Sequence, residues 1–515
     1  MRRASRREWI ALAVLALPCA VVTMDLTVLN LAVPALSEDL HPSSAQLLWT
    51  VDIYGFFIAG SLITMGTLGD RIGRRRLLLA GAAAFGVASL LAALSTSPGM
   101  LIAARAVLGV AGATLAPSTL SLIRSLFPND HDRTLAVGIW AASFSAGAGI
   151  GPLLGGALLE HFWWGSVFLP ALGVMALLLA LGPRLLPEFR NPAAGRIDLI
   201  SAGLSLTAVL TVIYGLKQVA QDGFGWFPLL VVLGGTAIGA WFLRRQPTLA
   251  DPLIDLQLFR APVFRASLAV NTTSLFVDAG LLLLIAQYLQ LVLGQSPLEA
   301  GLWTTPAAVG LIAGSLLAPV IVRRMPAGRT TAAGLALGAA GCALITQVTS
   351  TSGLAVLVAG STVMSFGIAM AGTLSTDLIV GSAPEERAGA ASALSETGTE
   401  LGTALGIAIL GSISTAVYRV QVALPADVAA STAHAARNTL GGAVSASERL
   451  PADLAAQLLD AATDAFTQAM RVTASLGAVI ALAMAIVADT VHRRLRPDRP
   501  QPPDQTTDIV AQEAP

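Results

Sequence analysis

The chain has 515 residues, of which 55% are hydrophobic and 12% are charged, and its formal net charge is zero. Soluble domains carry roughly 25% charged residues, so this composition excludes an ordinary soluble protein and predicts an integral membrane protein. Two cysteines, Cys19 and Cys342, exclude a disulfide framework. No phosphate-binding GxxxxGK[ST] motif and no metal-binding histidine spacing occur. We therefore expect no catalytic site, no metal, no cofactor and no nucleic-acid partner.

A membrane span needs about 20 predominantly apolar residues. Fourteen such runs follow one another along the chain: 9–33, 46–68, 77–96, 99–123, 134–159, 164–184, 197–218, 226–244, 264–293, 297–322, 329–349, 353–381, 388–418 and 468–491. The connections are short except at 185–196, 245–263 and 419–467. The fold class predicted from this pattern is an all-α integral membrane protein with 14 transmembrane helices.

The basic residues indicate the orientation of these spans. Most of the 31 arginines and lysines fall at the N-terminus, in every second connection and after the last span. Basic loops stay in the cytoplasm, so both termini are predicted to be cytoplasmic. The connection 419–467 is then external, and its Ala-rich stretches predict two helices in a hairpin over the outer face, with a flexible insertion as the alternative. The polar residues 492–515 predict a disordered cytoplasmic tail.

A compact motif, GTLGDRIGRRR, lies in the inner connection between the second and third spans. Asp70 stands where a helix end meets a turn, and the arginines that follow can pair with it or with a neighbouring helix terminus. A run of basic residues here is also explained by the cytoplasmic location of the connection alone, but the spacing of the whole motif is more specific than a basic run. We expect an inner-gate loop made of Gly66, Asp70, Arg71, Gly73, Arg74, Arg75 and Arg76. A weaker repeat, RRMPAGRTTAAG, follows the tenth span and favours two related halves.

The fifth span carries a glycine-rich face in GIWAASFSAGAGIGPLLGG. Gly147, Gly151 and Gly155 are spaced i, i+4, i+8 and share one side of a helix. Gly156 widens this face, and Pro152 lies within it. Small residues let membrane helices approach closely, so the alternative to a functional role is a close helix–helix contact of the kind common in membrane proteins.

These motifs together resemble a known family. The loop with Asp70 resembles the signature loop of the major facilitator superfamily, and LIAARAVLGVAGA in span 4, with Arg105, resembles its buried-arginine motif. MDLTVLNLAVP in span 1 is similar to the first-span motif of the 14-span drug:proton antiporters (DHA2). The spacing of Gly138, Gly147, Gly151, Pro152, Gly155 and Gly156 is similar to the antiporter motif. Within that family, the chain most resembles the QacA/SmvA/LfrA-like multidrug exporters.

The resemblance implies a major facilitator fold. Two pseudo-symmetric six-helix bundles, 1–184 and 264–491, would flank a linker, 185–263, that carries the extra spans 7 and 8. Arg105 would be a buried charge switch, and the region of Gly151 and Pro152 would seal span 5 in the outward-closed state. The implied function is proton-driven export of lipophilic, cationic drugs by a monomer in a bacterial cell membrane, with the proton gradient as the energy source.

Carboxylates inside membrane spans are costly and mark functional sites. The candidates for proton coupling or cation binding are Asp25, Asp52, Asp278, Glu396 and Glu400. Glu396 and Glu400 lie one turn apart on the same helix face. A site that binds either a proton or a cation is the minimum chemistry for antiport. Asp25 has a structural alternative, a hydrogen bond to Thr27 or Asn30, and Asp377 is expected to be a solvated or paired helix terminus.

Aromatic rings on the same helices are candidate contacts for aromatic cations: Tyr54, Phe144, Phe276, Tyr288, Trp303 and Phe366. Each ring alone is more often a packing residue. Span 10, GLWTTPAAVGLIAGS, lacks an acidic residue found in some relatives, which argues against dicationic substrates. The alternative function is a dedicated exporter of a single self-made antibiotic or other metabolite. The span 5 motif disfavours a uniporter or nutrient symporter, and the absence of a catalytic constellation disfavours a membrane enzyme.

Overall fold

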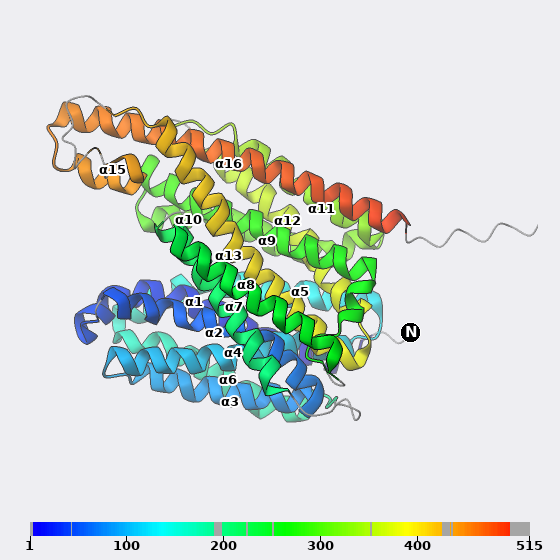
Figure 1. Cartoon of the computed structure of the whole chain (residues 1–515). Coiled ribbons are helices and arrows are strands. Elements are labelled where there is room, and N and C mark those ends of the chain that lie inside the picture. The colour runs from blue at the N-terminus through cyan, green and yellow to red at the C-terminus, as the bar shows by residue number, and fades with distance from the viewer. Residues whose placement is uncertain are drawn as a thin grey trace, which may run out of the picture.

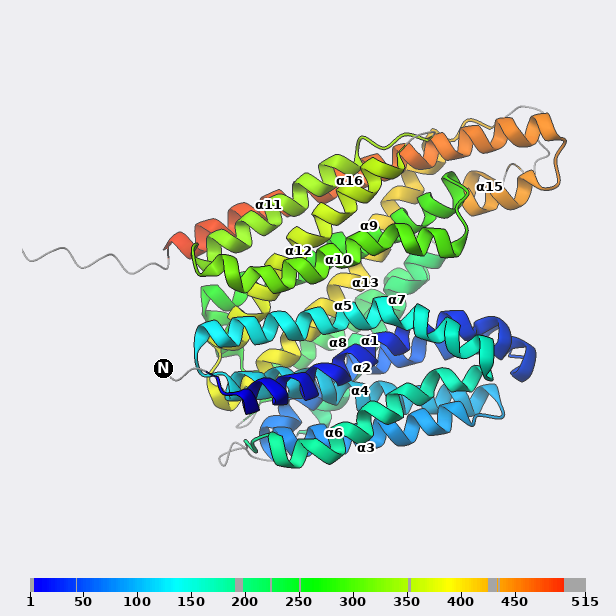
Figure 2. The same cartoon turned by 180° about the vertical axis from the view of Figure 1, so that it is seen from behind.

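The computed structural model describes residues 4–42, 44–189, 198–222, 225–249, 252–350, 353–424, 433 and 436–494. The described residues form helices and no strands, in two groups of long rods that run alongside one another (Figures 1 and 2). Fourteen helices among them are long and apolar enough to cross a membrane. The predicted all-helical class and the predicted number of spans are confirmed.

The first bundle has its own apolar core, and its helices are α1 (Arg6–Leu40), α2 (Ser44–Ile72), α3 (Arg74–Ala93), α4 (Pro98–Leu126), α5 (Asp130–His161) and α6 (Leu169–Leu185), with a 3₁₀ turn at Trp164–Phe168 before α6. Short polar caps set the helix starts. Ser97 accepts a hydrogen bond from the Met100 N–H ahead of Pro98, and Asn129 caps α5. Helix α4 therefore begins one residue, and α5 four residues, before the start of its predicted apolar run.

The second bundle is built around a separate core, and its helices are α9 (Pro262–Gln287), α10 (Pro297–Val322), α11 (Ala327–Ile345), α12 (Leu354–Ser382), α13 (Ala388–Gln421) and α16 (Ala452–Arg494). A π-helical turn, Tyr288–Val292, ends α9. Between the bundles in sequence come α7 (Leu199–Asp222) and α8 (Trp226–Arg245). Helix α7 packs on α2 and α13, whereas α8 packs mainly on α7. The extra pair thus touches both bundles through α7.

The N-terminus and the end of α16 lie at the same end of the molecule (Figures 1 and 2). We call this the terminal end and the opposite one the far end. Because successive spans alternate in direction, the turns α2–α3, α4–α5 and α12–α13 also lie at the terminal end. This shared end brings the motif around Asp70 close to the start of α13.

The connection before the last span differs from the predicted hairpin of two separate helices. Helix α16 starts at Ala452 and runs without a break to Arg494, so the second expected helix is an extension of the last span. A short helix, α15 (Leu440–Ser447), packs on this extension through Leu440 and Ala443. The first expected helix falls largely on 425–432 and 434–435, outside the described residues, as does the predicted disordered tail from residue 495.

Candidate functional site

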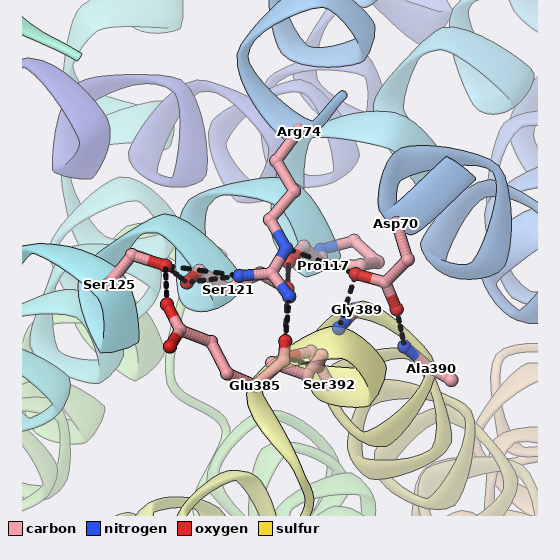
Figure 3. Close-up of polar contacts among 10 residues, drawn as sticks. Asp70, Arg74, Pro117, Ser121, Ser125, Glu385, Gly389, Ala390 and Ser392 are labelled. Atoms are coloured by element: carbon pink, nitrogen blue, oxygen red, sulfur yellow. Dashed lines mark hydrogen bonds and ion pairs between the residues drawn. The ribbon is translucent and has the colours of Figure 1, made fainter. Parts of the chain in front are cut away.

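The Asp70 carboxylate joins the two bundles at the terminal end (Figure 3). One oxygen accepts a hydrogen bond from the Gly389 N–H at 3.0 Å, and the other accepts one from the Ala390 N–H at 3.1 Å. Both donors belong to the first turn of α13, where backbone N–H groups have no partner within the helix. The positive end of the helix dipole also favours a carboxylate there. Asp70, on α2, therefore caps a helix of the other bundle.

Arg74 completes this contact from the start of α3. Its Nε donates to Asp70 at 3.0 Å, and its other nitrogens donate to Ser121 O at 3.3 Å, Ser125 Oγ at 3.1 Å and the Glu385 carbonyl (Figure 3). The guanidinium also lies 4.5 Å above the Phe189 ring. Arg74 is fully buried, so its charge depends on these partners.

Of the remaining residues of the predicted gate loop, only some contact the second bundle. Gly66 lies so close to Gly389 and Ala393 of α13 that a side chain would collide with them. Gly73 has a φ of 114°, which favours glycine, and Arg71 is buried.

Arg75 and Arg76 do not contact the second bundle through these ion pairs, because both pair with Glu188 of the first bundle. Arg75 also donates to the carbonyls of Pro183 and Leu186 at the end of α6. Contact with a neighbouring helix terminus is one of the two pairings expected for the arginines of this loop.

A second contact between the bundles lies nearby. Asp377 on α12 accepts a hydrogen bond from Arg133 Nε at 2.8 Å and another from Thr134 Oγ1 at 2.6 Å, both on α5. Arg124 of α4 donates to the Val380 carbonyl. Asp377 is therefore a paired helix terminus, one of the two predicted alternatives. Together with the Asp70 contact, these bonds close the terminal end.

The glycines of α5 contact two different helices. Gly138 lies against the Ser315 carbonyl and Pro319 of α10, in the other bundle, whereas Gly147 and Gly151 lie against Ala20, Met24 and Thr27 of α1. Gly155 is buried. Gly156 has open space beside it, so it does not extend the packed face as predicted, and the side chain of Pro152 is outside the described residues. The motif thus holds α1 and α10 close to α5.

Asp25 and Arg105 form a buried ion pair inside the first bundle. Arg105 Nη1 lies 2.7 Å from Asp25 Oδ2, and the side chains are 1% and 5% exposed for the arginine and the aspartate. The Arg105 guanidinium also lies 4.8 Å above the ring of Tyr54, whose hydroxyl donates to the Val22 carbonyl. Arg105 Nε has no hydrogen-bond partner within the described part of the chain. The structure therefore brings together two predicted site residues. Tyr54, a candidate cation contact, packs against the Arg105 side of this pair.

Asp52 has a partner that the sequence reading did not anticipate. It forms an ion pair with Lys217 of α7, and the Lys217 Nζ lies 4.7 Å from the centroid of the Phe56 ring. The extra helix pair therefore contributes a charged side chain to the interior face of α2.

Glu396 and Glu400 lie one turn apart in the middle of α13 and are half-buried. Among the described residues, neither carboxylate has a hydrogen-bond or ion-pair partner. Glu400 interacts electrostatically with Lys217, and Glu396 does so with Glu400. Asp278 is also half-buried, but it joins a different helix pair, α9 and α12, through Ser365 at 3.4 Å. The five acidic candidates thus occupy four places in the fold.

The other aromatic candidates differ in exposure. Tyr288 is fully buried and donates to the Thr349 carbonyl, so its ring is a packing element in this conformation. Phe144 lies edge-on to Trp140 at 4.8 Å. Phe276 and Phe366 are half-buried, and Trp303 is 42% exposed. No group of residues able to hold a metal ion occurs within the part of the chain that the structure describes.

A family model described as the Major Facilitator Superfamily matches residues 15–407. The chain belongs to this superfamily. It is 44% identical over 492 residues to the Multidrug efflux pump LfrA of Mycolicibacterium smegmatis, covering 96% of this chain and 98% of that protein. It is 36% identical to the Methyl viologen resistance protein SmvA of Salmonella typhimurium, covering 86% of this chain and 90% of that one. These relatives confirm the predicted resemblance to drug exporters of the superfamily.

A solved structure shows the same fold. The human organic anion transporter MFSD10 (TETRAN) has a TM-score of 0.60 and 15% sequence identity, covering 93% of this chain and 99% of that chain. Membership of the superfamily indicates a multi-pass membrane transporter rather than an enzyme.

Proposed function

We propose that the protein exports lipophilic cations from a bacterial cell in exchange for protons, by alternating access. The observation that carries this proposal is the pair Glu396 and Glu400, two neighbouring carboxylates without a bonded partner among the described residues. Carboxylates in a membrane interior are costly unless they are used. An acidic pair of this kind attracts a cation when it is ionised and releases it when it is protonated.

The closed end supports alternating access. The positive-inside rule assigns the terminal end to the cytoplasm, and there Asp70 and Asp377 hold the bundles together. This conformation is then closed inward, and a proton from outside would reach α13 and displace the bound cation. Export requires the contacts of Asp70 and Asp377 to break and re-form once in each cycle.

The pair Asp25–Arg105 supports a link between protonation and conformation. A buried ion pair is stable only while both partners are charged, and Arg105 has an unsatisfied Nε in addition. Protonation of Asp25 would leave Arg105 without its counter-charge and favour a rearrangement of α1 and α4. Asp25 would thereby act on the bundle interior without touching the cation.

The names of the relatives support the direction of transport and the class of substrate. LfrA is named a multidrug efflux pump, and SmvA is named for resistance to methyl viologen. Both match nearly the whole length of this chain. We extend drug efflux to this protein on that basis.

The test is uptake of ethidium, tetraphenylphosphonium and methyl viologen into everted membrane vesicles with an imposed proton gradient, acidic inside. Wild type should accumulate the monovalent cations, and Glu396→Gln should lower the initial rate at least about tenfold, the factor expected for losing 1.4 kcal/mol of coupling. Asp460→Asn, an exposed position on the α16 extension, is the matched control and should transport normally. The absence of gradient-driven uptake for every cation would overturn the proposal.

Methyl viologen in the same panel tests the expectation drawn from span 10. The described residues of α10 include one acidic residue, Glu299, which caps the start of that helix with Ser296. Uptake of this dication as fast as that of ethidium would show that the missing acidic residue does not limit recognition. A panel in which one compound alone is transported would favour a dedicated exporter.

A further inference from the structure

Lys217 is the only lysine in the chain, and it lies in a cluster of α2 and α7 side chains. Its ammonium group pairs with the Asp52 carboxylate and lies 4.7 Å from the centroid of the Phe56 ring. The side chain of Lys217 is 39% exposed and that of Asp52 is 22% exposed. A carboxylate and an aromatic ring therefore flank the ammonium group of a side chain that the rest of the protein does not fully cover.

Two further rings extend this cluster. Trp49 and Tyr214 are stacked, with centroids 6.5 Å apart and planes 7° apart, and Trp49 meets Phe56 edge-on at 6.2 Å. Trp49, Asp52 and Phe56 are spaced i, i+3, i+7 on α2, so they share one helix face. Trp49 is 43% exposed. The cluster thus offers aromatic surface beyond what a lysine ammonium covers.

Aromatic rings next to a carboxylate recognise organic ammonium groups, because the ring face attracts positive charge and its area suits apolar substituents. We propose that Trp49, Asp52, Phe56 and Tyr214 form a binding site for singly charged organic cations, and that Lys217 occupies this site as a tethered cation until a transported cation displaces it. This inference rests on the proposed function and adds to it a site between the first bundle and the extra helices.

The choice of lysine supports displacement over a fixed structural pair. Every other basic residue in the chain is arginine, whose planar guanidinium would hold a carboxylate by two parallel hydrogen bonds. An ammonium group on a flexible chain leaves more easily. The Lys217 charge also acts on Glu400 of α13, so the ammonium lies within electrostatic range of that carboxylate. Binding at Asp52 would thus change the charge beside the α13 carboxylates.

The experiment measures equilibrium binding of tetraphenylphosphonium to the purified full chain in detergent, without a proton gradient. In wild type the site would be free of the Lys217 ammonium for only about a third to a tenth of the time, which lowers the apparent affinity for the ligand by the same factor. Lys217→Met should therefore bind tetraphenylphosphonium about three- to tenfold more tightly than wild type. Lys217→Arg keeps a resident cation and should not tighten binding. Asp52→Asn added to Lys217→Met should remove the gain.

Equal or weaker binding by Lys217→Met would overturn the inference, as would a full gain that survives Asp52→Asn. If Lys217→Met does not purify as a folded protein, Trp49→Leu in the wild-type chain is the second test. It should weaken tetraphenylphosphonium binding at least threefold, and unchanged affinity would overturn the site.

The outcome also separates this inference from the proposed function. Gradient-driven uptake of tetraphenylphosphonium by wild-type vesicles, together with no tightening in Lys217→Met, would overturn the tethered-cation site alone. No binding of any cation to wild type or to Lys217→Met would overturn both.

Discussion

Replacing Asp70 by Asn should open the terminal end of the molecule. The carboxylate accepts two N–H groups from the start of α13 and pairs with Arg74. An amide of the same shape keeps one acceptor oxygen, turns an NH₂ group towards the other N–H, and leaves Arg74 without a counter-charge. The bonds to α13 exist only while the bundles are closed at this end, so their loss shifts a conformational equilibrium.

The magnitude follows from the bonds that are lost. Hydrogen bonds to a charged group contribute about 1.5 to 3 kcal/mol each, against about 1 kcal/mol for a neutral bond that Asn retains. Losing two such bonds and keeping one neutral bond should therefore destabilise the closed state by about 2 to 5 kcal/mol relative to the open one. At about 1.36 kcal/mol for each factor of ten, the equilibrium constant shifts about 30- to 5,000-fold towards the open state.

Distances between spin labels measure this shift. Pro187 lies in the first bundle and Met325 in the second, both exposed at the terminal end, and the two native cysteines are buried, so a labelled double-cysteine variant on a cysteine-free background is practical. Asp70→Asn should add or enlarge a long-distance population. Asp453→Asn, an exposed position at the far end, is the control. An unchanged distance distribution in Asp70→Asn, or an equal shift in the control, would refute the reasoning.

Two further substitutions test the interior of the first bundle. Arg105→Met should lower stability by about 3 to 5 kcal/mol, because it leaves the Asp25 charge buried and unpaired. Adding Asp25→Asn should recover part of that loss in thermal unfolding in detergent, and strictly additive losses would contradict a direct pair. Gly147→Val should destabilise the protein because the new side chain collides with the Ala20 backbone, whereas Gly156→Val should be tolerated. Equal unfolding temperatures for these two variants would show that the glycine face is not packed as described.

Much of the fold could be predicted from the sequence because membrane spans require long apolar runs. Helix ends were less predictable, since they depend on single polar caps such as Ser97 and Asn129. The α16 extension was predicted as a separate helix because it is an Ala-rich stretch before the last apolar run. In the structure one unbroken helix, Ala452–Arg494, includes both the stretch and the span.

The candidate site was predictable where a motif fixed the partners and not where they came from distant helices. Asp25 and Arg105 were both singled out, although their 2.7 Å contact joins α1 and α4. Pairing of Asp70 with an arginine of its own loop was predicted, and Arg74 provides it. The contact of Asp70 with α13 was not predicted, because its donors are two backbone N–H groups that no side-chain pattern marks. Lys217 was not among the predicted site residues. Its uniqueness among 31 basic residues was the available signal.

Helix α16 has a mechanical consequence. Its 43 residues give a length of about 65 Å at 1.5 Å per residue, roughly twice the hydrocarbon thickness of a bilayer. The part beyond the membrane, braced by α15, is therefore a stiff arm fixed to the second bundle. Any tilt of that bundle must swing the arm, and its tip moves further than the helices in the lipid. A fluorophore on the arm, paired with one on the far end of the first bundle, would therefore report each change of conformation.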